Sequence, residues 1–384
     1  MAWGRVIEVT FAPRARSATF VSGGSPEAPN VVVDNNQSGT KDVVTIRDLR
    51  MEFKVKKSIA DGAAGPTAEL KIYNMSLRTY FNAVKINCGL AIAVGYEDEM
   101  NGAMRTSSDV EPLHKVTKAQ GVPLQLFLGN IRYCRRYRDK ADWIVEVEAE
   151  ASMWEIGSIP LSLSYQPGID VYSMLQNLST SNRIPMPHLQ TVLQHNKIYS
   201  QGFSYFGNLR NFVFALCDAI DFTALIDAGE IKLIPPGGAF TSGLSYASAG
   251  GMTNPTTKGI FLSKETGLLQ APEPEQNSIA ASGASAVGDD AQSFPESRWN
   301  IESLLIPQVS PGDAMLVQSK IFGTDSSGKA KSVFMMVIEI EYDGDNWKGE
   351  HKMLAKCVPV DELGKPTTIE TPLIQSIPAQ PAED

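Results

Sequence analysis

The chain has 384 residues, of which 43% are hydrophobic and 20% are charged, a balance typical of globular rather than disordered proteins. At roughly 100–200 residues per domain, this length predicts two or three domains. The formal net charge of −9 disfavours a protein that grips nucleic acid, because such a protein needs a basic surface to neutralise phosphates.

Short strands dominate the first 150 residues. Alternating apolar and polar residues predict strands at 3–11, 43–57, 67–75, 89–96, 123–137 and 143–149. A change of parity between Ile46 and Leu49 indicates a bulge or break in the second of these strands. Ser76 is predicted to cap a short helix at 77–85. Many short strands with turn signals predict an antiparallel β-barrel domain for residues 1–150, with a loop insertion at 97–122.

From residue 151 the hydrophobic pattern changes from strand-like alternation to a mixture of helical and strand periods. This pattern predicts a small α/β module over residues 151–238. Its predicted elements are helices at 169–180 and 208–220 and a hairpin of strands at 223–226 and 230–234. Pro185 and Pro187 predict a loop after the first helix. Asn208 is a natural cap for the second helix, whose apolar stripe consists of Leu209, Phe212, Val213, Leu216 and Ile220.

A second β-rich stretch follows a linker at 239–258 that is rich in Gly, Ser, Thr and Asn. Alternation predicts strands at 299–306, 314–321, 333–342 and 351–358. We therefore expect a second β-barrel domain over 239–362 and an exposed, proline-rich tail at 363–384. The predicted fold class is mainly β with a smaller α/β part: two antiparallel barrels and a middle module.

Residues that usually carry chemistry form no recognisable pattern. The sequence has no P-loop, GxSxG or HExxH motif. The cysteines lie far apart with no CxxC pair, which predicts buried thiols at Cys88, Cys134, Cys217 and Cys357. Structural or surface roles are predicted for the histidines, which are His114, His188, His195 and His351. The prediction is a protein without catalytic, cofactor-binding or metal-binding residues, and not an enzyme.

The sequence shows no targeting signal and one short basic cluster. Glu8 interrupts the apolar run that a signal peptide would need, and no stretch approaches the roughly 20 apolar residues of a membrane helix. We therefore expect a soluble protein made in the cytoplasm, with no membrane anchor. The densest basic cluster is predicted to be a solvated rim or a subunit contact in preference to a nucleic-acid site; it contains Arg132, Arg135, Arg136, Arg138 and Lys140.

Five fragments carry a family resemblance. In chain order they are IYNMS at 72–76 with VGY at 94–96, LFLGNI at 126–131, TGLL at 266–269 with PE at 272–273, SLLIP at 303–307 with PG at 311–312, and YDGDNW at 342–347. Across about residues 42–360 these fragments resemble the baseplate hub proteins of contractile bacteriophage tails, the late-control protein D-like family. The insertion at 97–122 and a long loop at 272–297 exceed that family's pattern.

This resemblance implies a structural role in a virion tail baseplate, assembled in the host cytoplasm. Hubs of this family are trimers that join the hexameric tail tube to the central spike and contact other baseplate or tape-measure components. Two tube-like barrels per chain then give a ring of six from three chains. The resemblance also implies a channel through which DNA passes without specific binding, and an acidic lining would not retain DNA in transit. Injection machines other than phages share this type of hub.

Two alternatives stay open. The first is a tail-tip cell-wall or polysaccharide hydrolase, which needs an acid/base pair across a cleft; its candidates are Glu265, Glu273, Glu275 and Asp345. The second is a carbohydrate-binding module that stacks sugars on Trp299 or Trp347.

Overall fold

A computed structural model describes most of the predicted elements. The described residues are 4–12, 43–59, 65–97, 123–151, 159–182, 184–187, 189–227, 230–235, 260–275, 298–324 and 328–360. The predicted insertion beyond residue 97, the linker at 239–258 and the tail at 363–384 lie outside these residues, as do His114 and His188.

The N-terminal β-block is an antiparallel sheet with one short helix. Its strands run in the order β3-β4-β7-β6-β5-β1-β2. The elements are β1 (Gly4–Ala12), β2 (Val44–Ile46), β3 (Met51–Ser58), β4 (Thr67–Tyr73), α1 (Leu77–Ala83), β5 (Gly89–Glu97), β6 (Leu124–Asp139) and β7 (Asp142–Ala151). The predicted break after Ile46 is confirmed, because β2 pairs with β1 whereas β3 pairs with β4. Ser76 accepts a hydrogen bond from the backbone N–H of Thr79 and caps α1 as predicted.

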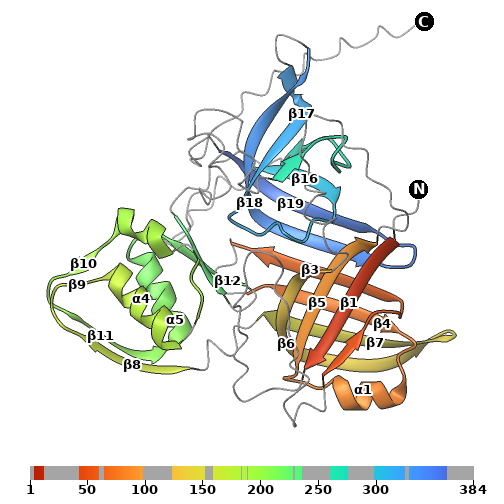
Figure 1. The fold of residues 1–384 in the computed structure, drawn as a ribbon, viewed down its shortest axis with the longest axis horizontal. Coiled ribbons are helices and arrows are strands. Elements are labelled where there is room, and N and C mark those ends of the chain that lie inside the picture. Colours follow the sequence, from red (N-terminus) through yellow and green to blue (C-terminus); the bar gives the residue numbers. More distant parts are fainter. Residues whose placement is uncertain are drawn as a thin grey trace, which may run out of the picture.

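The C-terminal β-block continues the same sheet. Its strands are β14 (Ile260–Leu262), β15 (Glu273–Pro274), β16 (Trp299–Leu304), β17 (Ala314–Thr324), β18 (Ala330–Asp345) and β19 (His351–Val360). They run β15-β16-β19-β18, and β17 pairs with β18 on one side and β14 on the other. Strand β18 also pairs with β3, so the two blocks form one 13-stranded sheet, visible in Figure 1 where the blue and orange strands meet.

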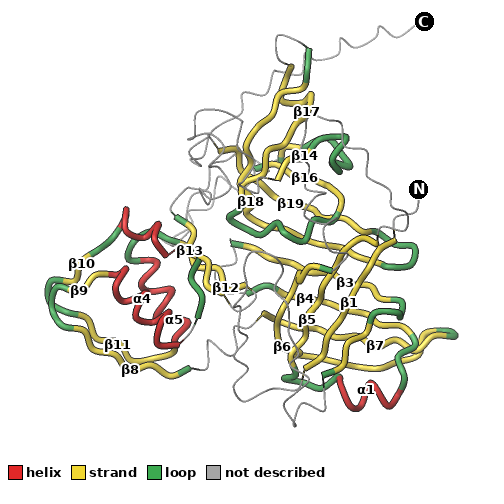
Figure 2. Tube along the Cα trace, viewed as in Figure 1, coloured by secondary structure: helices red, strands yellow, loops and turns green. Residues whose placement is uncertain are grey.

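The middle module sits beside the two β-blocks and holds the other helices of the described residues (Figures 1 and 2). Its elements are β8 (Pro160–Tyr165), β9 (Ile169–Asp170), α4 (Val171–Asn182), the 3-10 helix η1 (Leu189–His195), β10 (Ile198–Tyr199), β11 (Phe203–Asn208), α5 (Leu209–Asp218), β12 (Thr223–Asp227) and β13 (Glu230–Ile234). The Asn208 side chain caps α5 by accepting from the N–H of Asn211. The predicted stripe is buried, with Phe212 fully inside.

Two cores explain this architecture. Strands such as β3 bury every second side chain, so one apolar face per strand faces inward, as the period of a strand requires. The inward faces of both β-blocks contribute to one hydrophobic core, and the two helices and flanking strands of the middle module enclose a second. The predicted fold class, mainly β with a smaller α/β part, is confirmed.

Two local predictions were incomplete. The segment predicted as a loop after α4 contains η1, and residues 203–208, which received no element, form β11. Phe206 on β11 is 90% exposed, and this apolar side chain on the outer side of the strand hides the alternation in the sequence. Its neighbours Phe203 and Tyr205 point the other way and pack their rings on Phe212, so the strand is specified by its contact with α5.

Candidate assembly surface

Each β-block contains a long hairpin built to the same plan. Strands β6 and β18 both have 16 residues, and their partners β7 and β19 both have 10. The β6–β7 register shifts between Ile131 and Tyr133, and the β18–β19 register shifts between Val337 and Glu339. Adding 206 to a position in β6 therefore gives its counterpart in β18. The chain thus carries two structurally repeated units.

The joint between the blocks is a strand pairing along this repeat. Residues 339–345 of β18 pair antiparallel with residues 52–58 of β3. Gly344 lies so close to β3 that a Cβ atom there would fall 2.2 Å from the Phe53 ring. A glycine is therefore required at this point, because a larger side chain would push the two blocks apart.

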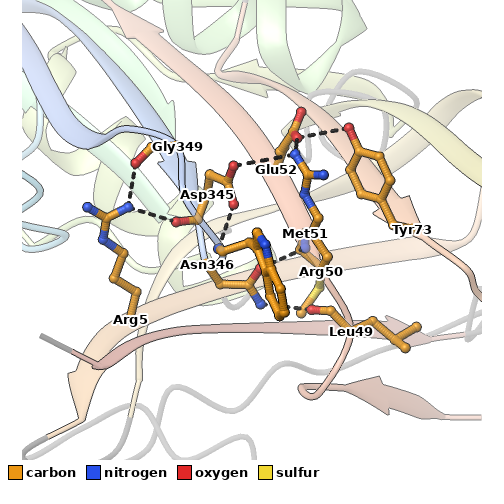
Figure 3. Close-up of polar contacts among 10 residues, drawn as sticks. Arg5, Leu49, Arg50, Met51, Glu52, Tyr73, Asp345, Asn346 and Gly349 are labelled. Atoms are coloured by element: carbon orange, nitrogen blue, oxygen red, sulfur yellow. Dashed lines mark hydrogen bonds and ion pairs between the residues drawn. The ribbon is translucent and has the colours of Figure 1, made fainter. Parts of the chain in front are cut away.

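A polar clamp closes the end of this joint (Figure 3). The Asn346 side chain accepts from the N–H of Met51 at 2.9 Å and donates to the carbonyl of Leu49 at 2.8 Å. From β1, the Arg5 guanidinium donates to the carbonyls of Asp345 and Gly349. These contacts fix the turn between β18 and β19 against the N-terminal block.

Beside the clamp, Arg50 links three side chains. Its guanidinium lies 4.2 Å from the centre of the Tyr73 ring, pairs with Glu52 and approaches Asp345 at 3.7 Å. Burial, together with the hydrogen bond that Tyr73 donates to Glu52, raises the pKa of Tyr73 to about 12. The hydroxyl therefore stays protonated and keeps donating at physiological pH.

Much of the face of the sheet opposite the core is charged and ion-paired, although Met336, Ile338 and Val358 belong to a small apolar cluster on that side. Strands of both blocks contribute pairs along it: Lys54–Glu341, Lys56–Glu339, Lys356–Glu339, Lys352–Glu302, Arg132–Glu150 and Arg135–Glu146. Exposed pairs of this kind are individually worth about 0–1 kcal/mol. Their arrangement matters more for which strands can lie side by side than for stability.

A buried ion pair attaches the middle module to both β-blocks. Lys57 on β3 and Asp227 on β12 meet at 2.8 Å with side chains only 4% exposed. Lys232 on β13 lies 3.6 Å from the same carboxylate, and Ser310, ahead of β17, donates to it at 3.4 Å. Burial raises the pKa of Asp227, but the attraction of Lys57 and Lys232 outweighs it and holds that pKa below its ordinary value.

The predicted basic cluster lies on the β6–β7 hairpin and is largely occupied within it. The contacts are Arg132 with Glu150, Arg135 with Glu146, Arg136 over the Trp143 ring at 4.0 Å, and Arg138 with the carbonyl of Lys140. All residues of the cluster except Arg136, which is half-buried, are exposed. The cluster is therefore a charged strand edge with internal partners, and its role as a subunit contact stays a prediction.

The structure contradicts the sugar-stacking role of Trp299. This side chain is 2% exposed and packs edge-on against Phe322 at 5.3 Å, so it cannot stack on a ligand. Trp347 is 68% exposed in the turn after β18. Its backbone N–H donates to Asp345, which gives that carboxylate a structural role.

Of the hydrolase candidates, Glu275 does not form a pair with Asp345. Glu275 lies 3.9 Å from Lys356, which pairs with Glu339 of β18. From there β18 continues six residues to Asp345, roughly 20 Å at the rise of a strand. Glycosidase carboxylates lie roughly 5–9.5 Å apart, so Glu275 and Asp345 cannot act together. Glu265 and Glu273 are exposed.

The histidines and cysteines that the structure describes are mostly packing residues. His351 begins β19 and is buried, and burial with Arg5 nearby lowers its pKa to about 4. Cys217 and Cys357 are buried as predicted, whereas Cys88 and Cys134 are only partly so. Within the described residues, no group of three or more His, Cys, Asp or Glu side chains could hold a metal ion. No helix in these residues is long and apolar enough to cross a membrane.

Comparisons with known proteins give matches among solved structures. No family profile and no curated protein matches the sequence. The chain is similar to a tail protein from Neisseria meningitidis MC58, at 7% identity and a TM-score of 0.47, over 94% of this chain and 98% of that one. It is similar to the 43 kDa tail protein of prophage MuSo2 from Shewanella oneidensis, at 8% identity and a TM-score of 0.47, over 92% and 98%. A third similar structure is the E. coli c3393 protein, a component of the type VI secretion system, at 10% identity and a TM-score of 0.44, over 84% and 76%.

Proposed function

We propose that this chain is a structural hub of a contractile tail, a homotrimer that joins a hexameric tail tube to a central spike. The observation that carries the proposal is the repeated hairpin unit, present once in each β-block and joined within the chain by β3 and β18. Three chains present six such units in a ring. Such a ring has true threefold symmetry and approximate sixfold symmetry. An adaptor between a hexamer and a trimer needs both.

The motifs that resemble the hub family serve this architecture. Asn74, in the IYNMS fragment, adopts a left-handed conformation with φ of 57°. Its side chain accepts from the N–H of Trp143 and donates to Asp142, which ties β4 to the tip of the β6–β7 hairpin. Gly129, in the LFLGNI fragment, would place a Cβ 2.3 Å from the carbonyl oxygen of Glu150. These positions are constrained by backbone geometry, which favours a structural role over a catalytic one.

We place the ion-paired face of the sheet toward the channel of the trimer. Its strands belong to both blocks, and acidic residues on it, such as Glu148 and Asp343, add to those in ion pairs. Because its lysines and arginines are engaged with carboxylates, such a face offers DNA few free cations and would let it pass without retention. The site of action is the tail of a virion, or of a related injection machine, with assembly in the host cytoplasm.

Particle size and shape test the proposal. Light scattering of the purified chain at micromolar concentration, alone and with tube and spike proteins, is expected to give about three chains per particle. Electron images are expected to show a ring with six similar lobes around a channel. A monomer under every one of these conditions would refute the trimeric hub.

The alternative of a hydrolase is tested separately. We expect no release of soluble fragments when the chain is incubated with peptidoglycan or capsular polysaccharide. Activity that disappears in Glu265→Gln or Glu273→Gln, with folding unchanged, would replace the structural role by an enzymatic one.

A further inference from the structure

The two repeated hairpins differ in one respect. In β18, residues 330–336 pair with β17 and residues 339–345 pair with β3. In β6, residues 124–130 pair with β5, but in the described part of the chain no strand pairs with the outer edge of residues 133–139. These are the counterparts of 339–345. The same stretch of the repeat therefore pairs with a strand in one block, whereas in the other it has no strand partner among the described residues; we call residues 133–139 the open edge.

The open edge has backbone groups directed outward. The N–H and C=O of Trp143 both bond to Asn74, the residue that follows β4: the N–H to its side chain and the C=O to its backbone N–H. Trp143 therefore cannot bond to Arg138, the residue opposite it in β6. Arg138 therefore directs its N–H and C=O away from β7, and by alternation so does Arg136. An edge with unpaired backbone groups is a template for another strand.

The repeat also identifies the strand that would fit. In the N-terminal block the hairpin is followed outward by β4 and then β3; in the C-terminal block it is followed by β16 and then β15. The registers make Pro274 the counterpart of Val55, because Pro274 pairs with Trp299 as Val55 pairs with Ala68. Residues 273–275 are thus the counterpart of 54–56, the part of β3 that covers β18.

Charge supports the same partner. Within the chain, a basic strand (Lys54 and Lys56 of β3) lies against an acidic one that contains Glu339 and Glu341. Between the open edge and the strand that would cover it, the two charges are exchanged. The open edge of β6 is basic, with Arg135 and Arg138, and the strand that would cover it carries Glu273 and Glu275. Opposite charges across strands are favourable, whereas like charges directly opposite are not.

We propose that the edge of β6 at residues 133–139 pairs with residues 273–275 of a second copy of this chain, repeating between chains the joint that β3 and β18 make within one. The ring that this pairing closes rests on the trimer proposed above. Pro274 faces the proposed joint and offers it only a carbonyl, because proline has no N–H; that carbonyl can accept from the outward N–H of Arg136, but the return bond that Val55 can donate within the chain is absent. Glu275 directs its N–H inward to the carbonyl of Arg298. The intrachain register Lys56–Glu341 places Glu275 opposite Arg135.

Disulfide trapping tests this register. In the proposed joint Arg135 and Glu275 form a pair without mutual hydrogen bonds, where opposite Cβ atoms come closest, about 4.5 Å apart, near the spacing of a disulfide. Mild oxidation of Arg135→Cys/Glu275→Cys is expected to give interchain dimers and a closed covalent trimer on a non-reducing gel, all lost on reduction. The controls are each single variant and the off-register pair Arg135→Cys/Glu265→Cys, which are expected to stay at the background set by the native thiols.

A second test removes one donor from the open edge. Arg136→Pro deletes an outward N–H that the β6–β7 ladder does not use, and Arg136→Ala keeps it; both lose the contact with Trp143. Because one hydrogen bond is lost, we expect the proline variant to associate roughly 3- to 10-fold more weakly per joint than the alanine variant. Circular dichroism and thermal melting of the two are expected to agree.

The outcomes separate the two proposals. A trimer by light scattering without specific trapping, or with equal trapping of the off-register pair, overturns this joint and leaves the hub intact. A monomer with no trapping overturns both. A covalent ladder that extends beyond three chains overturns the closed ring, and equal association of the two Arg136 variants overturns the strand pairing.

Discussion

Lys57 is expected to be a point at which the chain is sensitive to a single change. Its ammonium group is held by Asp227 in a buried contact that unites β3 with β12 of the middle module. Replacing Lys57 with Met keeps the length of the side chain and removes the charge. The Asp227 carboxylate would then remain buried with weaker compensation from Lys232 and Ser310.

The magnitude follows from burial. Removing one member of a buried ion pair costs about 3–5 kcal/mol, and because Lys232 still attracts Asp227 we expect the lower end, about 3 kcal/mol. The neighbouring residue provides a matched control. The Lys56 side chain is 44% exposed and pairs with Glu339, so Lys56→Met is expected to cost about 0–1 kcal/mol.

Hydrogen exchange read by mass spectrometry can localise the effect. In Lys57→Met we expect faster exchange in β12 and β13 and a lower urea midpoint, whereas Lys56→Met should resemble the parent chain. Adding Asp227→Asn to Lys57→Met should cost less than the sum of the single changes, with a coupling of about 1–3 kcal/mol. If Lys57→Met were no more damaging than Lys56→Met, the buried pair would not hold the module in place.

Three further perturbations test the fold. Phe212→Ala removes a fully buried ring and is expected to cost about 3–5 kcal/mol and to expose the middle module to limited proteolysis, whereas Arg210→Ala should be nearly silent; equal damage would refute the stripe of α5. Because burial depresses the pKa of His351 to about 4, the unfolded chain binds a proton first as pH falls below about 6.5, so stability drops between pH 6.5 and 4 by roughly 3 kcal/mol. Urea titrations of His351→Gln should show a shallower drop, and an unchanged slope would contradict a neutral buried imidazole. Gly344→Val drives a side chain into the Phe53 ring and should cost roughly 1–3 kcal/mol, read by thermal melting; a neutral result would show that β3 and β18 are not in contact there.

Local patterns predicted the elements whose own side chains alternate. The longer strands of both blocks and helix α5 were found because a single inward face is visible in the sequence around residues such as Phe53 and Phe212. The short strands β14 and β15 were not predicted, and β15 lies in a segment that was expected to be a loop. The joint of β3 with β18 was not predicted, because its partners lie nearly three hundred residues apart and pairing leaves no local signal. Lys56 and Lys57 are adjacent lysines that the sequence cannot distinguish. Lys57 is a buried contact only because the fold brings Asp227 against it.

The candidate surface was predicted in part. The cluster around Arg135 was expected to be a solvated rim or a subunit contact, and its open strand edge becomes apparent only when β6 is compared with β18. Glu275 was considered as a catalytic acid because carboxylates can serve as acids or bases in many reactions. The sequence cannot distinguish a carboxylate in a cleft from one on a strand edge. Trp299 was misassigned for the same reason, since nothing local to the residue indicates the ring of Phe322 that covers it.

The pairing of β3 with β18 also means that β3 waits for its partner strand while the chain is being synthesised. β3 ends at residue 58, whereas the strand that covers it reaches residue 345, so at about 5–20 residues per second the ribosome needs on the order of tens of seconds to supply it. During that interval β3 is an edge that neighbouring nascent chains on a polysome could use for pairing. Lys54 and Lys56 project from it, and lysines on an edge oppose such pairing. The side chains that later bind the acidic strand of the same chain can therefore protect the unfinished one.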